Sequence, residues 1–283
     1  MTNSKTLVYL SSLLSDRFPE FTTDLKKILT EENIPVEFLS GTKDIWCRDF
    51  FPVQLSKDRF VQFEYNPDYL VEFEERRTNP AEVIPRIDSD VFHSQLVIDG
   101  GNVIRHGRTA ILTNKIFKEN PAFRKRKPAL IQQLATELEV DKVVIIPRDP
   151  SDISGHADGM VRFVSENTVI INEYLESDRY SPLFIFESIR ALKSKGIRVV
   201  GTIPYRAFNW KNRDGDYTAI GCYINYLEVG NMIIFPKFGI AEDQEAFEKI
   251  QKYFPSNRIY QLDCRGIAEE GGVLNCISWN LVT

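Results

Sequence analysis

Three kinds of reactive side chain stand out in the sequence: a thiol, an imidazole and carboxylates. Cys276 ends the segment GGVLNC, His156 and Asp158 lie in GHAD, and Asp49 follows Arg48 in WCRD. Thiolate attack on carbon needs a cysteine with a lowered pKa or an adjacent base, and an imidazole can move protons to a leaving group and from water. Carboxylates beside a nucleophilic thiolate would raise its pKa, so they need another purpose, which holding a cation would supply.

The cation that suits paired carboxylates best is a guanidinium, because its planar fork of N–H donors matches them bidentately. The constellation therefore predicts a substrate with an arginine-like group. His156 and Asp158 could instead be two metal ligands, but no third and fourth ligand follow at a suitable spacing. We therefore expect no metal.

Five hairpin-like segments are spread along the chain. Each has apolar residues at every second position and turn residues in the middle. They are residues 51–65, 102–114, 160–174, 222–236 and 273–282. Their starting positions are 51, 58, 62 and 51 residues apart, which is a loose repeat of the size of one supersecondary unit.

Helical spacing separates the hairpins. Segment 181–196 has Ser181 and Pro182 at cap and first-turn positions and ends at Gly196, so it predicts a helix. Apolar spacing also predicts helices within 21–33, 127–140 and 242–255, and a weaker one within 69–83. Short β-rich stretches follow the helices at residues 35–39, 94–99, 142–147, 198–204 and 258–263.

The repeating unit is therefore a ββαβ module of hairpin, helix and strand. The chain begins with a strand at 7–11 and a helix but ends with a bare hairpin, so we expect the N-terminus to complete the last module. This closes a ring of five modules. The prediction is one α/β domain over residues 1–283.

In each module the connection into the hairpin carries unusual polar residues, and a symmetric ring would bring these connections to one central axis. The residues at this point of the repeat are Asp49, Asp99, His156 with Asp158, Asn225 and Cys276. Side chains from distant parts of the sequence are therefore expected to converge.

Five short motifs resemble, in this order, those of the agmatine deiminase and bacterial peptidyl-arginine deiminase family. They are WCRDFFP at 46–52, DGGN at 99–102, GHADGMVRF at 155–163, YIN at 223–225 and GGVLNC at 271–276, and together they cover nearly the whole chain. The resemblance implies the pentein fold, a five-bladed α/β-propeller of guanidine-modifying enzymes around a central active site. It agrees with the five-module pattern, which rests on periodicity.

The resemblance also implies a reaction. Cys276 would attack the guanidinium carbon and form a covalent thiouronium intermediate. His156 would protonate the departing ammonia and then activate water, while Asp49 and Asp158 would grip the guanidinium nitrogens. The substrate implied first is agmatine, hydrolysed to N-carbamoylputrescine and ammonia, without metal or organic cofactor.

Four further residues are expected at the substrate. Trp46 would wall the pocket, and Asn225 lies where the family has a polar active-site residue. Asp99 matches the motif acid, but contact with the substrate and orientation of its own loop stay equally open for it. Gly272, with Gly271, would let the substrate approach the sulfur closely.

Two positions depart from the family pattern. Phe51 stands at the usual glycine position of the first motif, and Asn275 stands where agmatine deiminases commonly have histidine. Both are expected to border the pocket, so agmatine, peptide-bound arginine, free arginine and another monosubstituted guanidine all stay open as substrates. An amine tail would need an acidic or polar rim, for which Glu269, Glu270, Asp214 and Asp216 are candidates. The alternatives in other classes are an amidinotransferase of the same fold and a guanidine-binding module without catalysis.

Several other conspicuous residues are explained more simply by structural roles. Buried cysteine often serves as a small apolar residue, and a lone histidine is usually an ordinary surface or core group. We therefore expect structural roles for Cys47, Cys222, Cys264, His93, His106, Arg48 and Arg162, with Arg48 bracing the loop that presents Asp49.

The composition of the chain limits which classes of partner are expected. A net charge of -5 over 283 residues argues against a nucleic-acid binder, which needs a basic surface. Four cysteines at irregular spacing make neither a disulfide framework nor a zinc motif and fit a reducing cytoplasm. No apolar run is long enough to cross a bilayer, and the N-terminus lacks the pattern of a signal peptide. The expected partner is a small guanidine, and the resemblance leaves a homodimer open.

Overall fold

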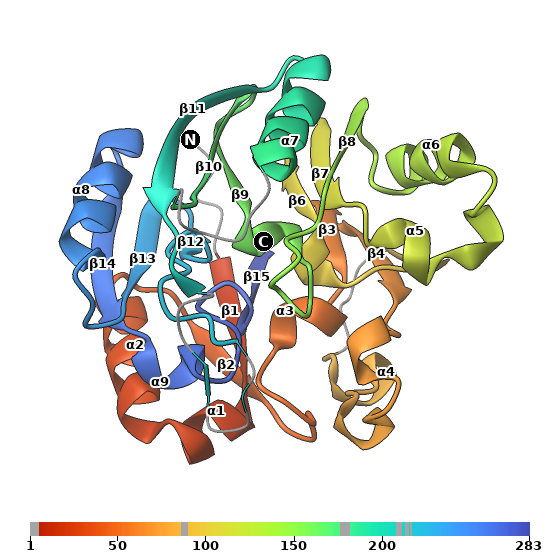
Figure 1. Ribbon diagram of the computed structural model, residues 1–283. Coiled ribbons are helices and arrows are strands. Elements are labelled where there is room, and N and C mark those ends of the chain that lie inside the picture. Colours follow the sequence, from red (N-terminus) through yellow and green to blue (C-terminus); the bar gives the residue numbers. More distant parts are fainter. Residues whose placement is uncertain (1–5, 86–89, 176–181, 208–210, 213–214, 216) are drawn as a thin grey trace.

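Five three-stranded sheets surround a common centre in the part of the chain that the structure describes (Figure 1). The computed structural model describes all residues except 1–5, 86–89, 176–181, 208–210, 213–214 and 216. The strands, sheet by sheet, are β3 (Val53–Ser56), β4 (Arg59–Glu64) and β5 (Asp90–Val97); β6 (Ile104–His106), β7 (Thr109–Thr113) and β8 (Lys142–Ile146); β9 (Val161–Ser165), β10 (Thr168–Glu173) and β11 (Arg198–Pro204); β12 (Leu227–Val229), β13 (Met232–Lys237) and β14 (Arg258–Asp263); and β15 (Ser278–Val282), β1 (Thr6–Ser11) and β2 (Val36–Leu39). The arrangement confirms the predicted five-module α/β-propeller.

All five sheets have the same topology. The middle strand pairs antiparallel with the first strand and parallel with the third. The middle strands β10 and β13 are buried over most of their length, and β7 is buried along its whole length. Continuous burial of this kind is typical of strands that are covered on both faces.

The two ends of the chain share one sheet. β1 pairs antiparallel with β15, from Thr6 opposite Val282 to Leu10 opposite Ser278, and parallel with β2. The N-terminus therefore completes the last module, as predicted from the unpaired hairpin at the end of the sequence.

The fifth predicted hairpin, residues 273–282, is wrong in detail. Residues 274–277 form a tight turn, and only β15 is a strand, with β1 as its antiparallel partner. The turn is held by the Ile277 amide, which donates to the Val273 carbonyl, and by the Ser278 hydroxyl, which donates to the Leu274 carbonyl. Its residues are apolar because the turn is buried, and an apolar turn imitates a strand in the sequence.

Four helices lie where the spacing predicted them: α2 (Pro19–Glu31), α6 (Lys127–Glu137), α7 (Pro182–Ser194) and α8 (Asp243–Tyr253). The shorter helices are α1 (Ser12–Arg17), α3 (Cys47–Phe50), α4 (Pro80–Val83), α5 (Ile116–Glu119) and α9 (Arg265–Ala268), with 3-10 turns η1 (Asp68–Leu70), η2 (Glu74–Arg76), η3 (Gly100–Asn102), η4 (Pro121–Phe123) and η5 (Ala157–Gly159). The long helices lie outside the strands, and the sheets face the centre (Figure 1).

The weaker helix predicted within residues 69–83 is wrong. The segment contains η1, η2 and α4 instead of one continuous helix. Val71 and Phe73 are exposed, so no continuous apolar face is buried along it. Pro80 would break a helix at this point, and it starts α4 instead, where Asn79 caps the amide of Ala81.

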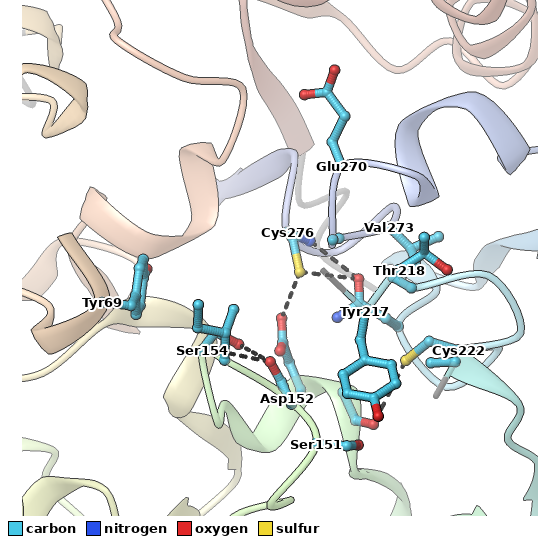
Figure 2. A pocket seen from close by; sticks show the side chains of 18 of the residues that line it. Tyr69, Ser151, Asp152, Ser154, Tyr217, Thr218, Cys222, Glu270, Val273 and Cys276 are labelled. Carbon is cyan, nitrogen blue, oxygen red and sulfur yellow. Dashed lines mark hydrogen bonds between the residues drawn. The ribbon is translucent and has the colours of Figure 1, made fainter. Parts of the chain in front are cut away.

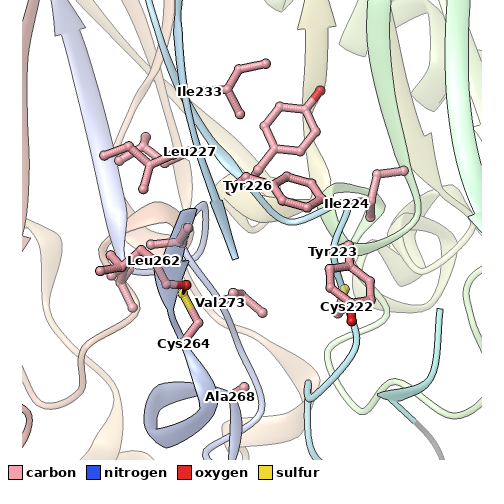
Figure 3. Close-up of a cluster of buried hydrophobic side chains, with 14 of the residues drawn as sticks. Cys222, Tyr223, Ile224, Tyr226, Leu227, Ile233, Leu262, Cys264, Ala268 and Val273 are labelled. Carbon is pink, nitrogen blue, oxygen red and sulfur yellow. Dashed lines mark hydrogen bonds between the residues drawn. The ribbon is translucent and has the colours of Figure 1, made fainter. Parts of the chain in front are cut away.

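The largest apolar core cluster lies around the fourth and fifth modules. Figure 3 shows part of it, including Tyr223, Tyr226, Leu262 and Val273. Cys264 lies fully buried in the same cluster, as expected for a structural cysteine. This packing supports the backbone that carries the turns at residues 223–226 and 274–277.

Among the described residues, no helix combines the length and apolar character that crossing a bilayer requires.

Candidate active site

Backbone hydrogen bonds join the hairpin entries at the centre of the ring. The Arg48 amide donates to the Cys276 carbonyl (3.0 Å), and the Asn275 amide donates to the Asn225 carbonyl (3.1 Å). The Gly101 amide donates to Oδ1 of Asp49 (3.3 Å). The entries therefore converge, although the sequence separates them widely.

A cavity of about 650 Å³ opens at this centre. Cys276, Asp158 and Asn225 line it, and because the last two are almost fully buried they mark its inner end. Figure 2 shows the sulfur of Cys276 pointing into the space between Tyr69 and Tyr217. The volume suits a small-molecule ligand, for which pockets of about 300–1,000 Å³ are usual.

The thiol of Cys276 lies beside two acceptors. Its Sγ is 3.3 Å from Oδ1 of Asn225 and 3.6 Å from Oδ2 of Asp158. Burial, followed by the negative charges of Asp158 and Asp49, raises the pKa of the Cys276 thiol well above its ordinary value. A raised pKa favours the neutral thiol, and a cation beside Asp158 would offset the negative charge that contributes to it.

Asn275 holds Asp158 from behind. Its Nδ2 donates to Oδ2 of Asp158 (2.7 Å), and its Oδ1 accepts a bond from a terminal guanidinium nitrogen of Arg162 (3.0 Å). The Arg162 guanidinium also lies over the Tyr226 ring, 4.5 Å from its centroid. Arg162 and Asn275 thus orient a carboxylate that faces the cavity.

The expectation that both departures from the family pattern border the pocket is wrong. Asn275 is buried and is not among the described residues that line the cavity. Phe51 stacks on Trp279, with ring centroids 4.4 Å apart, in an aromatic core cluster with Tyr9 and Phe50. The phenylalanine ring is accommodated at position 51 because it packs against Trp279 of β15.

Arg48 joins the loop that carries Asp49 to the turn that carries Cys276. Besides its backbone bond to Cys276, its Nε donates to the carbonyl of Asn275 (3.3 Å). Burial lowers the pKa of Arg48 to about 10, and nearby Arg162 adds to this effect. Arg48 therefore fixes the turn that carries Cys276 against the loop that carries Asp49.

His156 lies between two carboxylates. Its Nε2 is 2.8 Å from Oδ2 of Asp99, and its Nδ1 is 3.4 Å from Oδ1 of Asp49. Burial alone would lower the pKa of His156, but Asp49 and then Asp99 outweigh it and raise the pKa to about 9. Burial also raises the pKa of Asp49 to about 7, although His156 opposes this.

These groups pack closely around Gly101. A Cβ atom added there would come 2.6 Å from Oδ1 of Asp49, 2.7 Å from Nδ1 of His156 and 3.4 Å from Oδ2 of Asp158, so a larger residue would displace Asp49 and His156. Of the three groups, Asp158 is among the described residues that line the cavity, and it lies beside the sulfur of Cys276.

Trp46 and Gly272 are in contact. A Cβ atom at Gly272 would overlap the Trp46 ring, so only glycine allows this approach. Gly272 lines the cavity, whereas Trp46 lies behind it and is not among the described lining residues. Trp46 thus supports the wall instead of forming it.

The structure describes two of the four acidic residues that were expected at the rim of the pocket. Glu270 lines the cavity and pairs with Arg17, whereas Glu269 is exposed and is not among the described lining residues. Asp214 and Asp216, also named for the rim, lie outside the described residues.

The remaining cysteines and histidines are arranged as expected. Cys47, Cys222 and Cys264 are buried, and burial raises the pKa of each thiol, whereas Cys276 is partly exposed. Cys222 does line the cavity, with its Sγ 3.7 Å from the carbonyl of Gly159. His93 and His106 are exposed. The described residues contain no group of three side chains suited to hold a metal ion.

Lys115 was not among the residues singled out from the sequence, and its side chain is fully buried beside Asp99 and His156. Its ammonium pairs with Asp99 and lies 2.9 Å from Oε1 of Glu119. The spacing of Lys115 and Glu119, four residues apart after a buried strand, was the available signal.

The model of the Porphyromonas-type peptidyl-arginine deiminase family matches residues 15–281, nearly the whole chain. The chain belongs to this family. Membership confirms the family resemblance and, with it, the expectation of a hydrolase that acts on C–N bonds of amidines.

Similar proteins agree in fold. An agmatine deiminase of Pseudomonas syringae pv. syringae is 25% identical over 289 residues, which cover 87% of this chain and 76% of that protein. The structure of the C. jejuni agmatine deiminase with substrate bound matches with a TM-score of 0.81 at 17% identity and covers 99% of this chain and 94% of that one. The agmatine deiminase of Enterococcus faecalis gives a TM-score of 0.75 at 19% identity, covering 98% and 93%. The fold is thus that of the guanidine-modifying penteins.

Proposed function

We propose that this protein is a guanidine deiminase with Cys276 as its nucleophile, in one catalytic domain. The observation that carries the proposal is the grouping of the carboxylates of Asp49 and Asp158 and the imidazole of His156 around Gly101, with Asp158 and the sulfur of Cys276 at the cavity. A guanidinium bound between the two carboxylates would have an acceptor on two sides and the sulfur of Cys276 nearby.

The bound cation would also activate the nucleophile. Burial and negative charge raise the pKa of the Cys276 thiol, so a guanidinium beside Asp158 favours the thiolate. The thiol proton passes to water in the cavity, and the thiolate then forms the C–S bond at the guanidinium carbon. The two carboxylates hold the substrate nitrogens while charge moves from sulfur to the substrate.

His156 would act first as an acid and then as a base. With a pKa raised to about 9, it is mostly imidazolium at neutral pH and can give a proton to the departing nitrogen. The C–N bond breaks, ammonia leaves, and a thiouronium remains on Cys276. The neutral imidazole then takes a proton from water, whose oxygen attacks the same carbon. The C–S bond breaks and a ureido product leaves.

We propose agmatine as the first substrate to test, because the relatives described above carry that activity in their names. An acidic residue suits its amine tail: Asp152 lines the cavity, and Ser154 anchors its Oδ1 through two hydrogen bonds of 2.7 and 2.8 Å. Arg148, exposed at the mouth, instead favours a carboxylate tail such as that of free arginine. A peptide-bound arginine, which the family name suggests, has neither charged group on its tail.

Side-by-side assays separate these substrates and the rival functions. Ammonia and ureido product should form from agmatine, and the rates with free arginine and a blocked arginine peptide rank the tails. A new guanidino compound in the presence of an added amine, without ammonia release into water, would indicate an amidinotransferase. Binding without turnover in wild type would indicate a binding module.

We also propose that the protein acts in the cytoplasm and can form a homodimer. Four free cysteines agree with a reducing cytoplasm. A homodimer is testable by light scattering.

A further inference from the structure

Lys115 occupies a buried position that the reaction outlined above does not use. Its side chain is fully buried at the N-cap position of α5, and its ammonium lies among three carboxylates. The ammonium pairs with Asp99, is 2.9 Å from Oε1 of Glu119 and is 3.7 Å from Oδ1 of Asp68. Burying an ammonium is costly unless carboxylates compensate it, so the cluster depends on all of these groups.

The contact of interest is on Asp99. Lys115 and Nε2 of His156 both bond to the same oxygen, Oδ2, while Oδ1 of Asp99 has no hydrogen-bond partner. Nζ of Lys115 and Nε2 of His156 are themselves 3.5 Å apart. The lysine therefore competes with the histidine for one carboxylate oxygen and places a positive charge beside the imidazole.

We propose that Lys115 is a positioning residue that limits how strongly Asp99 and Asp49 hold the proton of His156, so that the imidazole can both give and take a proton. Two carboxylates alone would fix an imidazolium, which can protonate a leaving group but cannot accept a proton from water. The opposing charge of Lys115 reduces this bias. The effect of Lys115 on catalysis rests on the proposed function, whereas the effect of its charge on the His156 imidazole does not.

All charged groups around the pair enter this balance. His156 faces Asp49 and Asp99, and the edge of Tyr69 approaches its ring at 6.0 Å between centroids. The ammonium of Lys115 lies 4.8 Å from the Tyr69 centroid. Beyond these, Lys118 pairs with Asp68 (2.6 Å), which screens that carboxylate from Lys115.

Removing the charge of Glu119 should have the opposite effect on His156 to removing the charge of Lys115. Burial raises the pKa of Glu119 to about 7, and its carboxylate offsets part of the charge of Lys115. Burial would lower the pKa of Lys115, but Asp99 and Glu119 outweigh it, so the lysine stays charged. Removing the lysine charge and removing the glutamate charge should therefore move His156 in opposite directions.

The experiment is an NMR titration of the imidazole signals of the intact protein between about pH 6 and 10.5. The chain has only three histidines, and the exposed His93 and His106 serve as internal controls. A His156→Gln variant assigns the third signal. Wild type, Lys115→Met, Lys115→Arg and Glu119→Gln are compared, with circular dichroism to verify folding.

We expect Lys115→Met to raise the pKa of His156 by about one unit or more, the usual effect of one nearby charge, so that the imidazole stays mostly protonated at pH values where it has lost its proton in wild type. Glu119→Gln should lower it, and Lys115→Arg should change it by less than about half a unit because the charge stays. If the wild type deiminates agmatine, Lys115→Met should also slow release of the covalent adduct at pH 7. The rate should fall roughly tenfold for each unit by which the pKa of His156 rises.

An unchanged or lower pKa of His156 in folded Lys115→Met overturns the proposal. A higher pKa in Glu119→Gln also overturns it, and this variant remains informative if Lys115→Met does not fold. Absence of deiminase activity in wild type would refute the proposed function instead, and the titration would still decide the role of Lys115.

Discussion

Asp158 lies 3.6 Å from the sulfur of Cys276, close enough for its charge to control ionisation of the thiol. It is also one of the two carboxylates proposed to hold the guanidinium. Asp158→Asn should therefore change two properties in opposite directions. The thiol should become more reactive toward a neutral reagent, and turnover of a guanidine substrate should fall.

The magnitude follows from the distance. At an effective dielectric constant of about 20, unit charges this far apart repel by roughly 4–5 kcal/mol, which is roughly 3 pKa units. The cavity admits water and the asparagine still accepts hydrogen bonds, so we expect the pKa of Cys276 to fall by about 1–3 units. Loss of one carboxylate should lower kcat/KM for agmatine by about 100-fold or more, because a charge-assisted bidentate contact is lost.

The assay is the pH dependence of alkylation by iodoacetamide, which is uncharged. Cys276→Ala supplies the background, which should be low because the other three cysteines are buried. Ammonia release is measured on the same preparations. Asp152→Asn is the matched control, since it removes a carboxylate that lines the cavity but has no hydrogen bond to Cys276 among the described contacts.

An Asp158→Asn thiol whose pKa is unchanged or higher would refute the reasoning, because the carboxylate would then not oppose the thiolate. Equal pKa changes in Asp158→Asn and Asp152→Asn would point to a general field of the cavity instead of a direct contact.

Three further predictions follow from single contacts. Gly101→Ala should abolish deimination at a cost of about 1–3 kcal/mol in unfolding free energy, because its methyl would displace Asp49 and His156; kinetics and denaturation measure the two effects, and a fully active variant would contradict the roles proposed for these two side chains. Asn275→Ala should lower kcat/KM by about 10–100-fold, because Asp158 loses a hydrogen bond to its charged form worth about 1.5–3 kcal/mol; unchanged kinetics would argue against this support. The raised pKa of His156 stabilises the fold below about pH 6.5, and this contribution is lost as the pH rises through about 9; urea titrations should show a smaller loss over this range in His156→Gln than in wild type, and equal losses would contradict it.

The ring and its polar centre were accessible from the sequence because their signals are local. Alternation around Gly107 marks one hairpin, and the cap and stop residues of 181–196 mark one helix. The unpaired ends of the chain then implied that β1 and β15 share a sheet. Placing polar residues at equal points of a repeat was sufficient to predict that His156 and Cys276 lie in one region.

The remaining features depend on which side chains meet in space. Asn275 stands next to Cys276 in sequence, yet its amide lies between Asp158 and the guanidinium of Arg162, which packs over Tyr226. Phe51 finds its partner in Trp279, far along the chain. Lys115 in TNKIF resembles any surface lysine until its three carboxylate neighbours are known. No spacing within one segment carries that information.

The most direct test of the proposed function is to mix the protein with excess agmatine, quench the reaction with acid within milliseconds to seconds, and measure the intact mass. We predict a transient increase equal to the mass of agmatine less ammonia, mapped by peptide analysis to Cys276 and absent in Cys276→Ala. Ammonia release by Cys276→Ala at the wild-type rate, or steady turnover by wild type with a trapped adduct on any other residue, would contradict the assignment of Cys276 as the nucleophile.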